Sequence, residues 1–150
     1  MPASEPASTT APRRTPGVGR VLVVVYAILA LAATGRSVFQ IIDRFSEAPV
    51  AFTLSALSAV VYIVATVALI GRWNRVAFVT IAFELVGVLV IGTITTFAPG
   101  LIGLASNDPF GRTSTVWSSY GLGYLLVPLV LPVLGLLYLR SQRRASVRAA

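Results

Sequence analysis

Hydrophobic residues fill four long stretches of the chain, and most polar residues gather between them. A helix rises about 1.5 Å per residue, so roughly 20 apolar residues cross the ~30 Å hydrocarbon core of a bilayer. The four stretches, residues 21–42, 50–70, 76–97 and 120–139, each have about this length. They predict an all-α fold, an integral membrane protein built as a bundle of four transmembrane helices.

The segments around these stretches define the expected domain organisation. Residues 1–19 are rich in Pro, Ala, Ser and Thr, which is typical of a disordered tail. The transmembrane domain then covers residues 20–140, and residues 141–150 form a short basic tail. Four helices with short connections leave no room for a separate soluble domain.

One connection differs from the others. Residues 43–49 and 71–75 are short, so they predict tight turns between antiparallel helices. Residues 98–119 form a long loop that contains turn signals such as Pro99-Gly100. This loop is either a simple connector or the place of an external contact. Trp117 and Tyr120 follow where an interfacial aromatic belt belongs.

The arginines set the expected orientation. All 12 basic residues are Arg, and nine of them lie in the N-terminal segment, the 71–75 turn and the C-terminal segment. Only Arg44 and Arg112 lie on the opposite side. The positive-inside rule then places both termini in the cytoplasm. The net charge of +7 therefore reflects topology and attraction to anionic membrane lipids, and we expect no nucleic-acid partner.

Several classes of chemistry are excluded by composition. The chain has no Cys and no His, which rules out a Ser-His-Asp triad, disulfides and the usual zinc ligands. It also has no phosphate-binding P-loop and no GxGxxG motif. We expect no enzymatic activity, no cofactor and no metal site.

The first apolar stretch allows a second interpretation. Residues 21–29 can serve as the hydrophobic region of a signal peptide, with Ala30-Leu31-Ala32 as the cleavage site. Removal would leave three spans in the same orientation. Apolar residues continue as far as Ile42, which favours retention of the segment.

Glu84 is a carboxyl group inside a predicted span. It lies nine residues beyond Arg75, or ~13 Å from the inner surface by helical rise. Tyr26 and Tyr62 reach similar depths from the first two spans, so either hydroxyl can hydrogen-bond the carboxyl group. Burial without a neighbouring cation favours its neutral form. Glu84 is therefore either a structural hydrogen-bonding group between helices or a proton carrier.

Arg36 is the second ionisable group at membrane depth, a few ångströms below the outer interface by helical rise. Gln40 and Asp43 continue a polar stripe that opens outward. Arg36 either extends its side chain to lipid phosphate and water, or forms an anion or head-group site with Tyr124 at matching depth. A direct pair with Glu84 is not expected, because the two levels differ by ~10 Å.

Small residues indicate close helix contacts. Ala51, Ser55 and Ala59 repeat at four-residue intervals in the second span, and Gly87 and Gly92 mark the third. In the fourth span, two prolines free backbone carbonyls and predict a bend, at positions Pro128 and Pro132. The simplest interpretation is packing within the bundle.

Residues 47–69 and 115–140 resemble a group of small four-span integral membrane proteins from actinobacteria, and residues 35–41 (GRSVFQI) and 83–93 (FELVGVLVIGT) fit the same group. The resemblance implies an actinobacterial plasma-membrane protein and supplies no function. It lowers the odds of cleavage after the first span, because Arg36 lies in one of these segments.

Two functional hypotheses follow. The first is a non-catalytic accessory, regulatory or scaffold component that associates with itself or with another membrane protein. The second is a small oligomeric transporter or permeability protein that uses Glu84, with or without coupling to protons. Small multidrug transporters also have four helices and one intramembrane Glu, but theirs lies in the first helix, so that likeness is one of general architecture.

Overall fold

The computed structural model describes residues 16–104 and 110–148, and all of its regular structure in these ranges is helical. Four α-helices are present: α1 (Pro16–Arg44), α2 (Pro49–Ile70), α3 (Asn74–Phe97) and α4 (Val127–Arg148). Three short 3₁₀ helices connect them: η1 (Phe45–Glu47), η2 (Pro99–Ile102) and η3 (Ser118–Tyr124). The predicted all-α fold is confirmed. In the described ranges, three helices are long and apolar enough to cross a membrane, or four if η3 and α4 form one bent span.

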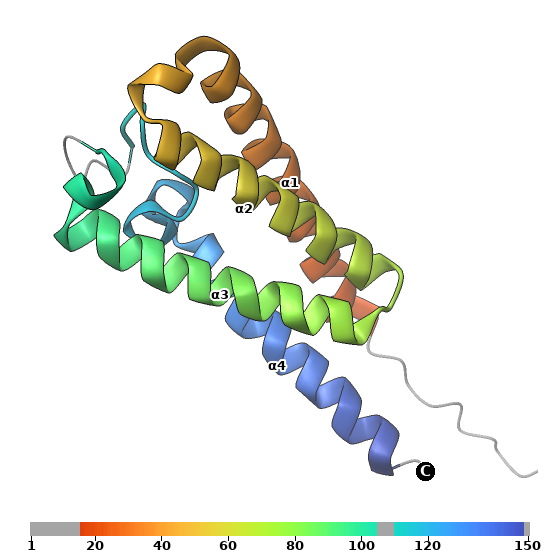
Figure 1. The fold of residues 1–150 in the computed structure, drawn as a ribbon. Coiled ribbons are helices and arrows are strands. Elements are labelled where there is room, and N and C mark those ends of the chain that lie inside the picture. Colours follow the sequence, from red (N-terminus) through yellow and green to blue (C-terminus); the bar gives the residue numbers. More distant parts are fainter. Residues whose placement is uncertain (1–15, 105–109, 149–150) are drawn as a thin grey trace, which may run out of the picture.

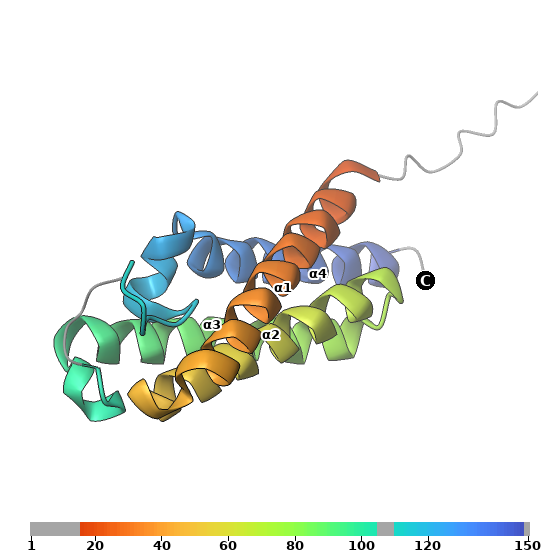
Figure 2. The ribbon, with the colours of Figure 1, turned by 90° about the horizontal axis from the view of Figure 1, so that it is seen from above.

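The helices pack as two neighbouring pairs. α1 packs mainly on α2, and α4 packs mainly on α3, which also contacts α2. The start of α1, the α2–α3 turn and the end of α4 lie at one end of the molecule, and η1 and η2 lie at the other (Figure 1). α1 crosses the rest of the bundle obliquely (Figure 2), so it makes few contacts with α4.

Two predicted boundaries move in the structure. α1 begins at Pro16, so residues 16–19 are helical. The prediction that the disordered tail extends through these four residues is wrong. Proline is well suited to the first helical position, where its missing N–H has no partner to lose. α4 continues to Arg148 and so includes most of the expected basic tail, whereas residues 1–15 lie outside the described part of the chain. Pro49 begins α2, as the sequence predicts.

The fourth predicted span, residues 120–139, is not one continuous helix. Leu125 and Leu126 adopt left-handed backbone conformations with φ of 56° and 60°, and η3 meets α4 at an angle of 98°. Pro128 suits the first turn of α4, where its missing N–H has no helical partner to lose, and Pro132 lies inside the same helix. The expected bend is a full break at Leu125 and Leu126, and α4 supplies only the part of this passage from Val127 onward.

The segment that precedes α4 fills the rest of this fourth passage. Residues 114–118 are all buried although they are not α-helical. Their hydroxyl groups serve the backbone: Ser118 Oγ accepts from Thr115 N at 2.8 Å, and Thr115 Oγ1 accepts from Trp117 N at 3.1 Å. Thr95 Oγ1 of α3 accepts from Ser119 N at 2.8 Å. Irregular backbone at membrane depth is tolerated only where protein surrounds it in this way.

Trp117 does not lie in the interfacial aromatic belt that the sequence predicts. Its side chain is 1% exposed and lies inside the bundle, not at a membrane interface. It packs against Gly87 of α3, where a Cβ would lie 2.9 Å from Trp117 Cζ3. Tyr120 packs in the same way against Gly92, where a Cβ would lie 2.7 Å from the Tyr120 backbone nitrogen. The two glycines of α3 therefore allow the segment that contains Trp117 and Tyr120 to pack directly against this helix.

Small residues of α2 also pack inside the chain. Ala51, Ser55, Ser58 and Ala59 are 0–5% exposed. The interpretation of this repeat as a packing face within the bundle is confirmed.

We predict that Gly87→Ala and Gly92→Ala each lower the free energy of unfolding by about 1–3 kcal/mol, because a methyl group overpacks a buried contact. The matched control is Gly35→Ala, since a Cβ at position 35 has no atom within 4 Å. That variant should be neutral or slightly more stable, because alanine favours helix. Thermal unfolding in detergent micelles measures all three. Equal effects at the three positions would show that the loop does not rest on α3.

Candidate functional site

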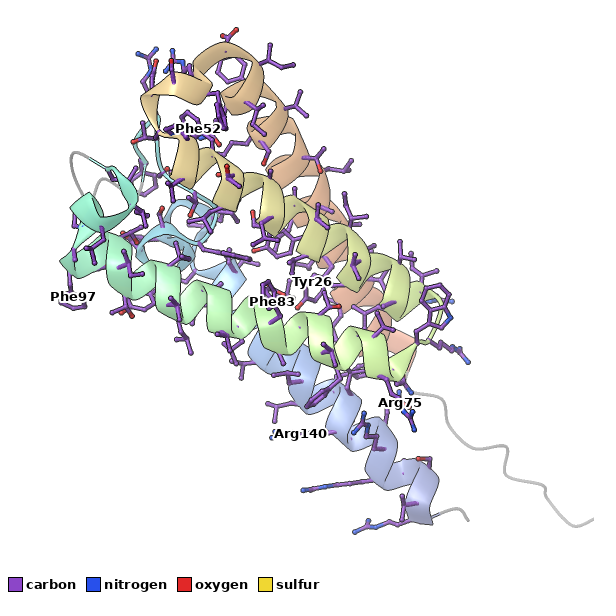
Figure 3. All side chains as sticks on the ribbon, viewed as in Figure 1. Tyr26, Phe52, Arg75, Phe83, Phe97 and Arg140 are labelled. Atoms are coloured by element: carbon purple, nitrogen blue, oxygen red, sulfur yellow. The ribbon has the colours of Figure 1, made fainter. Side chains whose placement is uncertain are left out.

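Glu84 lies near the middle of α3 and is completely buried, as are Tyr26 of α1 and Tyr62 of α2. The Tyr26 hydroxyl donates a hydrogen bond to Glu84 Oε2 at 2.8 Å. Figure 3 shows Tyr26 in the interior, between α3 and the α1–α2 pair. The contact that the sequence suggested between these two residues is present in the structure, and it ties α1 to α3.

Tyr62 completes the cluster from α2. Its ring centroid is 6.3 Å from that of Tyr26, and its hydroxyl accepts a hydrogen bond from Trp117 Nε1 at 3.2 Å. The same hydroxyl is close enough to the Glu84 carboxyl group to interact with it electrostatically. We call Tyr26, Tyr62, Glu84 and Trp117 the Glu84 cluster. Each member comes from a different segment of the chain.

Sequence reasoning missed Trp117 as a member of this cluster. The available signals were the glycine at position 87, one turn beyond Glu84, and the run of hydroxyl residues around the tryptophan. A Ser/Thr-rich segment can satisfy its own backbone when buried, so such a loop does not need to lie in water.

The hydrogen-bond donors and acceptors of the cluster show which protonation states of Glu84 it can accommodate. Glu84 Oε1 is buried and has no hydrogen-bond partner among the described residues. The Tyr62 hydroxyl accepts from Trp117 and still has its own proton to donate, as well as a second lone pair. It can therefore donate to an ionised carboxylate or accept from a neutral carboxylic acid after a small shift. The two tyrosines suit either protonation state of Glu84.

The cluster is closed to solvent. Neither of the two surface pockets described below includes Glu84 or either tyrosine in its lining. No described Arg forms an ion pair with Glu84; the ion pair seen within residues 16–104 and 110–148 joins Arg44 to Glu47 at 4.0 Å. The geometry is that of an interhelical hydrogen bond rather than an open binding site.

Arg36 lies at the other end of the molecule and has different partners. Its Nη2 donates to Gly111 O at 3.1 Å, Ser114 O at 2.9 Å and Ser114 Oγ at 2.7 Å. Gln40, one turn further along α1, donates from Nε2 to Arg112 O at 3.2 Å and to Ser114 O at 3.3 Å. These two side chains of α1 hold the start of the loop that carries Trp117.

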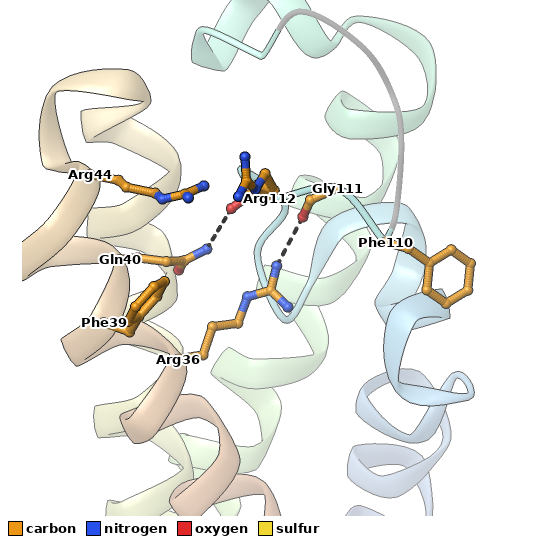
Figure 4. A pocket seen from close by; sticks show the side chains of 7 residues that line it. All are labelled: Arg36, Phe39, Gln40, Arg44, Phe110, Gly111 and Arg112. Atoms are coloured by element: carbon orange, nitrogen blue, oxygen red, sulfur yellow. Dashed lines mark hydrogen bonds between the residues drawn. The ribbon is translucent and has the colours of Figure 1, made fainter.

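A cavity of about 340 Å³ lies beside these contacts (Figure 4). Among the described residues, seven line it: Arg36, Phe39, Gln40, Arg44, Phe110, Gly111 and Arg112. We call it the arginine pocket. Tyr124, expected near Arg36, is not among its lining residues and instead packs, partly buried, against the hydrophobic core, because the break before α4 moves it there.

Arg44 and Arg112 are members of the pocket that sequence reasoning did not group with Arg36. Arg44 follows Arg36 and Gln40 at the same four-residue interval, so the three share one face of α1. Nothing in the sequence shows that residue 112 returns to this face.

Comparison with known proteins adds no relative. No protein-family model, no curated protein and no solved structure matches the chain. Function is therefore argued from the residues and their geometry.

We predict that Tyr26→Phe lowers the free energy of unfolding by about 0.6–2 kcal/mol, the usual range for an interhelical hydrogen bond in a membrane protein. The control is Tyr138→Phe, which removes an exposed hydrogen bond to Gln142 and should change stability by less than about 0.5 kcal/mol. Denaturation in mixed micelles compares the two. A Tyr26→Phe effect no larger than that of the control would show that the Glu84 hydrogen bond does not stabilise the bundle.

Proposed function

We propose that the protein is a non-catalytic component of a bacterial plasma membrane, with four spans and both termini in the cytoplasm. It acts as an accessory, regulatory or scaffold subunit of another membrane protein. The observation that carries this proposal is the closed Glu84 cluster: the carboxyl group inside α3 is buried, hydrogen-bonded to another helix, and away from the described pockets. In this proposal, η3 and α4 together form the fourth passage.

The distribution of arginines in space supports the orientation. Arg75 and Arg140 lie toward the end of the molecule where α1 begins and α4 ends (Figure 3), and several other arginines belong to the same segments. Arg44 and Arg112 line a pocket at the opposite end, beside the acidic residue Glu47. A cytoplasmic surface rich in Arg is the usual arrangement.

The topology is tested by cysteine labelling, since the chain has no native cysteine. We predict that Ser146→Cys is protected from a membrane-impermeant maleimide in intact cells and reacts after permeabilisation. Thr113→Cys, in the segment that precedes η3, should react before permeabilisation. The reverse pattern would place the termini outside.

A groove between α1 and α4 is the surface that we assign to the partner. It has a volume of about 740 Å³ and lies where the two helices diverge. Val18 and Val21 line it from α1, and Leu134, Leu137 and Tyr138 line it from α4. The small-residue face of α2 is used inside the chain, so it is not free for association. An apolar helix of another membrane protein would fill this groove by van der Waals packing.

Native mass spectrometry of gently extracted, tagged protein tests the proposal. We expect a second membrane protein to co-purify in fixed stoichiometry. Leu137→Trp should fill the groove and abolish that association, whereas Val86→Trp on α3, a 58% exposed position outside the groove, should retain it. A homo-oligomer without any partner would contradict the accessory role.

A proton-coupled transporter is the second candidate, because Glu84 Oε1 is a buried acceptor without a partner. Such a protein would be oligomeric, since four helices enclose little volume. Under this alternative, Glu84→Gln abolishes proton-coupled flux in proteoliposomes while the protein still inserts. Under the accessory role, Gln retains the acceptor for Tyr26 and leaves stability nearly unchanged, whereas Glu84→Leu leaves the Tyr26 hydroxyl unpaired and lowers stability.

A further inference from the structure

The arginine pocket concentrates positive charge without a matching acid in its lining. Arg36, Arg44 and Arg112 all line it, and no Asp or Glu among the described residues does. Within the described ranges, only Arg44 has an ion pair, to Glu47 at the limiting distance of 4.0 Å. Three guanidinium groups around one cavity repel each other, so an anion between them would lower the electrostatic energy of this end of the molecule.

Arg36 is held in a fixed orientation by the protein. All three of its hydrogen bonds are made by Nη2, to Gly111 and Ser114. Its Nη1 and Nε have no acceptor among the described residues, and Nε is buried. A guanidinium group has five N–H donors in a planar fork, so donors remain for a second, anionic partner.

Gln40 indicates a second property of the ligand, a hydrogen-bond donor. Its side chain is 3% exposed, and its Nε2 donates to two carbonyl oxygens, Arg112 O and Ser114 O. Since both partners are acceptors, the amide orientation is fixed and Oε1 is the atom left over. Gln40 Oε1 is buried and has no partner among the described residues, and Gln40 is one of the residues that line the same pocket. A ligand that satisfies it must carry a hydrogen-bond donor as well as negative charge.

The surroundings of the pocket indicate the source of that ligand. Phe39 and Phe110 also line it, and their side chains are 56% and 73% exposed. Helical rise places Arg36 just below the outer interface of a bilayer, at the level of lipid phosphates. Exposed aromatic side chains at this level can pack against the acyl chains and glycerol backbone of a lipid. A free anion in water offers no such apolar contact, so these side chains favour a lipid.

We propose that the arginine pocket binds the phosphate of an anionic phospholipid whose head group carries a hydroxyl donor, as in phosphatidylglycerol. Arg36, Arg44 and Arg112 neutralise the phosphate, and Gln40 Oε1 accepts a hydrogen bond from the head-group hydroxyl. The assignment to the outer leaflet rests on the proposed topology, which cysteine labelling tests separately; the lipid preference itself does not depend on it.

Lipid binding is measured on the full-length protein in micelles doped with one phospholipid at a time, by native mass spectrometry. We expect phosphatidylglycerol to bind at least about tenfold more tightly than phosphatidylcholine, since a hydrogen bond to a charged group contributes enough for a tenfold change. Phosphatidylmethanol, which has the same charge but no head-group hydroxyl, should bind less tightly than phosphatidylglycerol. Equal binding of the three lipids would overturn the proposal.

Arg112→Gln and Arg44→Gln test the pocket without removing the hydrogen bonds of Arg36 to the loop. Each should weaken phosphatidylglycerol binding about tenfold, and Arg72→Gln, at the opposite end of the molecule, should leave it unchanged. Loss of binding in all three variants, or in none, would contradict a local site. Inorganic phosphate is the competitor: if millimolar phosphate displaces phosphatidylglycerol from the pocket, the ligand is a free anion and the lipid assignment is wrong.

Discussion

The hydrocarbon of a bilayer offers no hydrogen-bond partner, and this constraint governs every polar contact inside the bundle. Glu84 Oε2 meets it through Tyr26 at 2.8 Å. The same contact connects α1 to α3, two helices that are not neighbours in sequence. Because water cannot replace the bond, separating these helices leaves a buried carboxyl group and a buried hydroxyl unpaired. This hydrogen bond therefore both satisfies Glu84 Oε2 and holds α1 against α3.

The same constraint explains the loop before α4. The left-handed backbone at Leu125 and Leu126 ends α4 at Val127, so backbone that is not α-helical must fill the space before it. The loop contains a high density of Ser and Thr, and their hydroxyls together with that of Thr95 accept from three of its N–H groups, those of Thr115, Trp117 and Ser119. Arg36 and Gln40 hold the start of the segment, and the Trp117–Tyr62 bond holds its end. A loop built in this way is part of the core.

Sequence periodicity and length predicted the helical class, three of the long helices and the internal small-residue packing, because these follow from local composition. The Tyr26–Glu84 contact was accessible too, since helical rise gives depth without knowledge of the fold. The break at Leu125–Leu126 was not, because hydropathy does not distinguish a straight span from a bent one. The burial of Trp117 and the return of Arg112 to α1 depend on how the loop folds back, and no local signal specifies that path.

The two polar sites share the segment from Gly111 to Trp117. Its first half is bound by Arg36 and Gln40, and its last residue contacts both Gly87 and Tyr62 in the Glu84 cluster. A ligand that draws the Arg36 guanidinium away from Ser114 would release one end of this segment, of which residues 114–117 are buried. The segment thus connects the arginine pocket to the Glu84 cluster, and α1 contributes side chains to both sites.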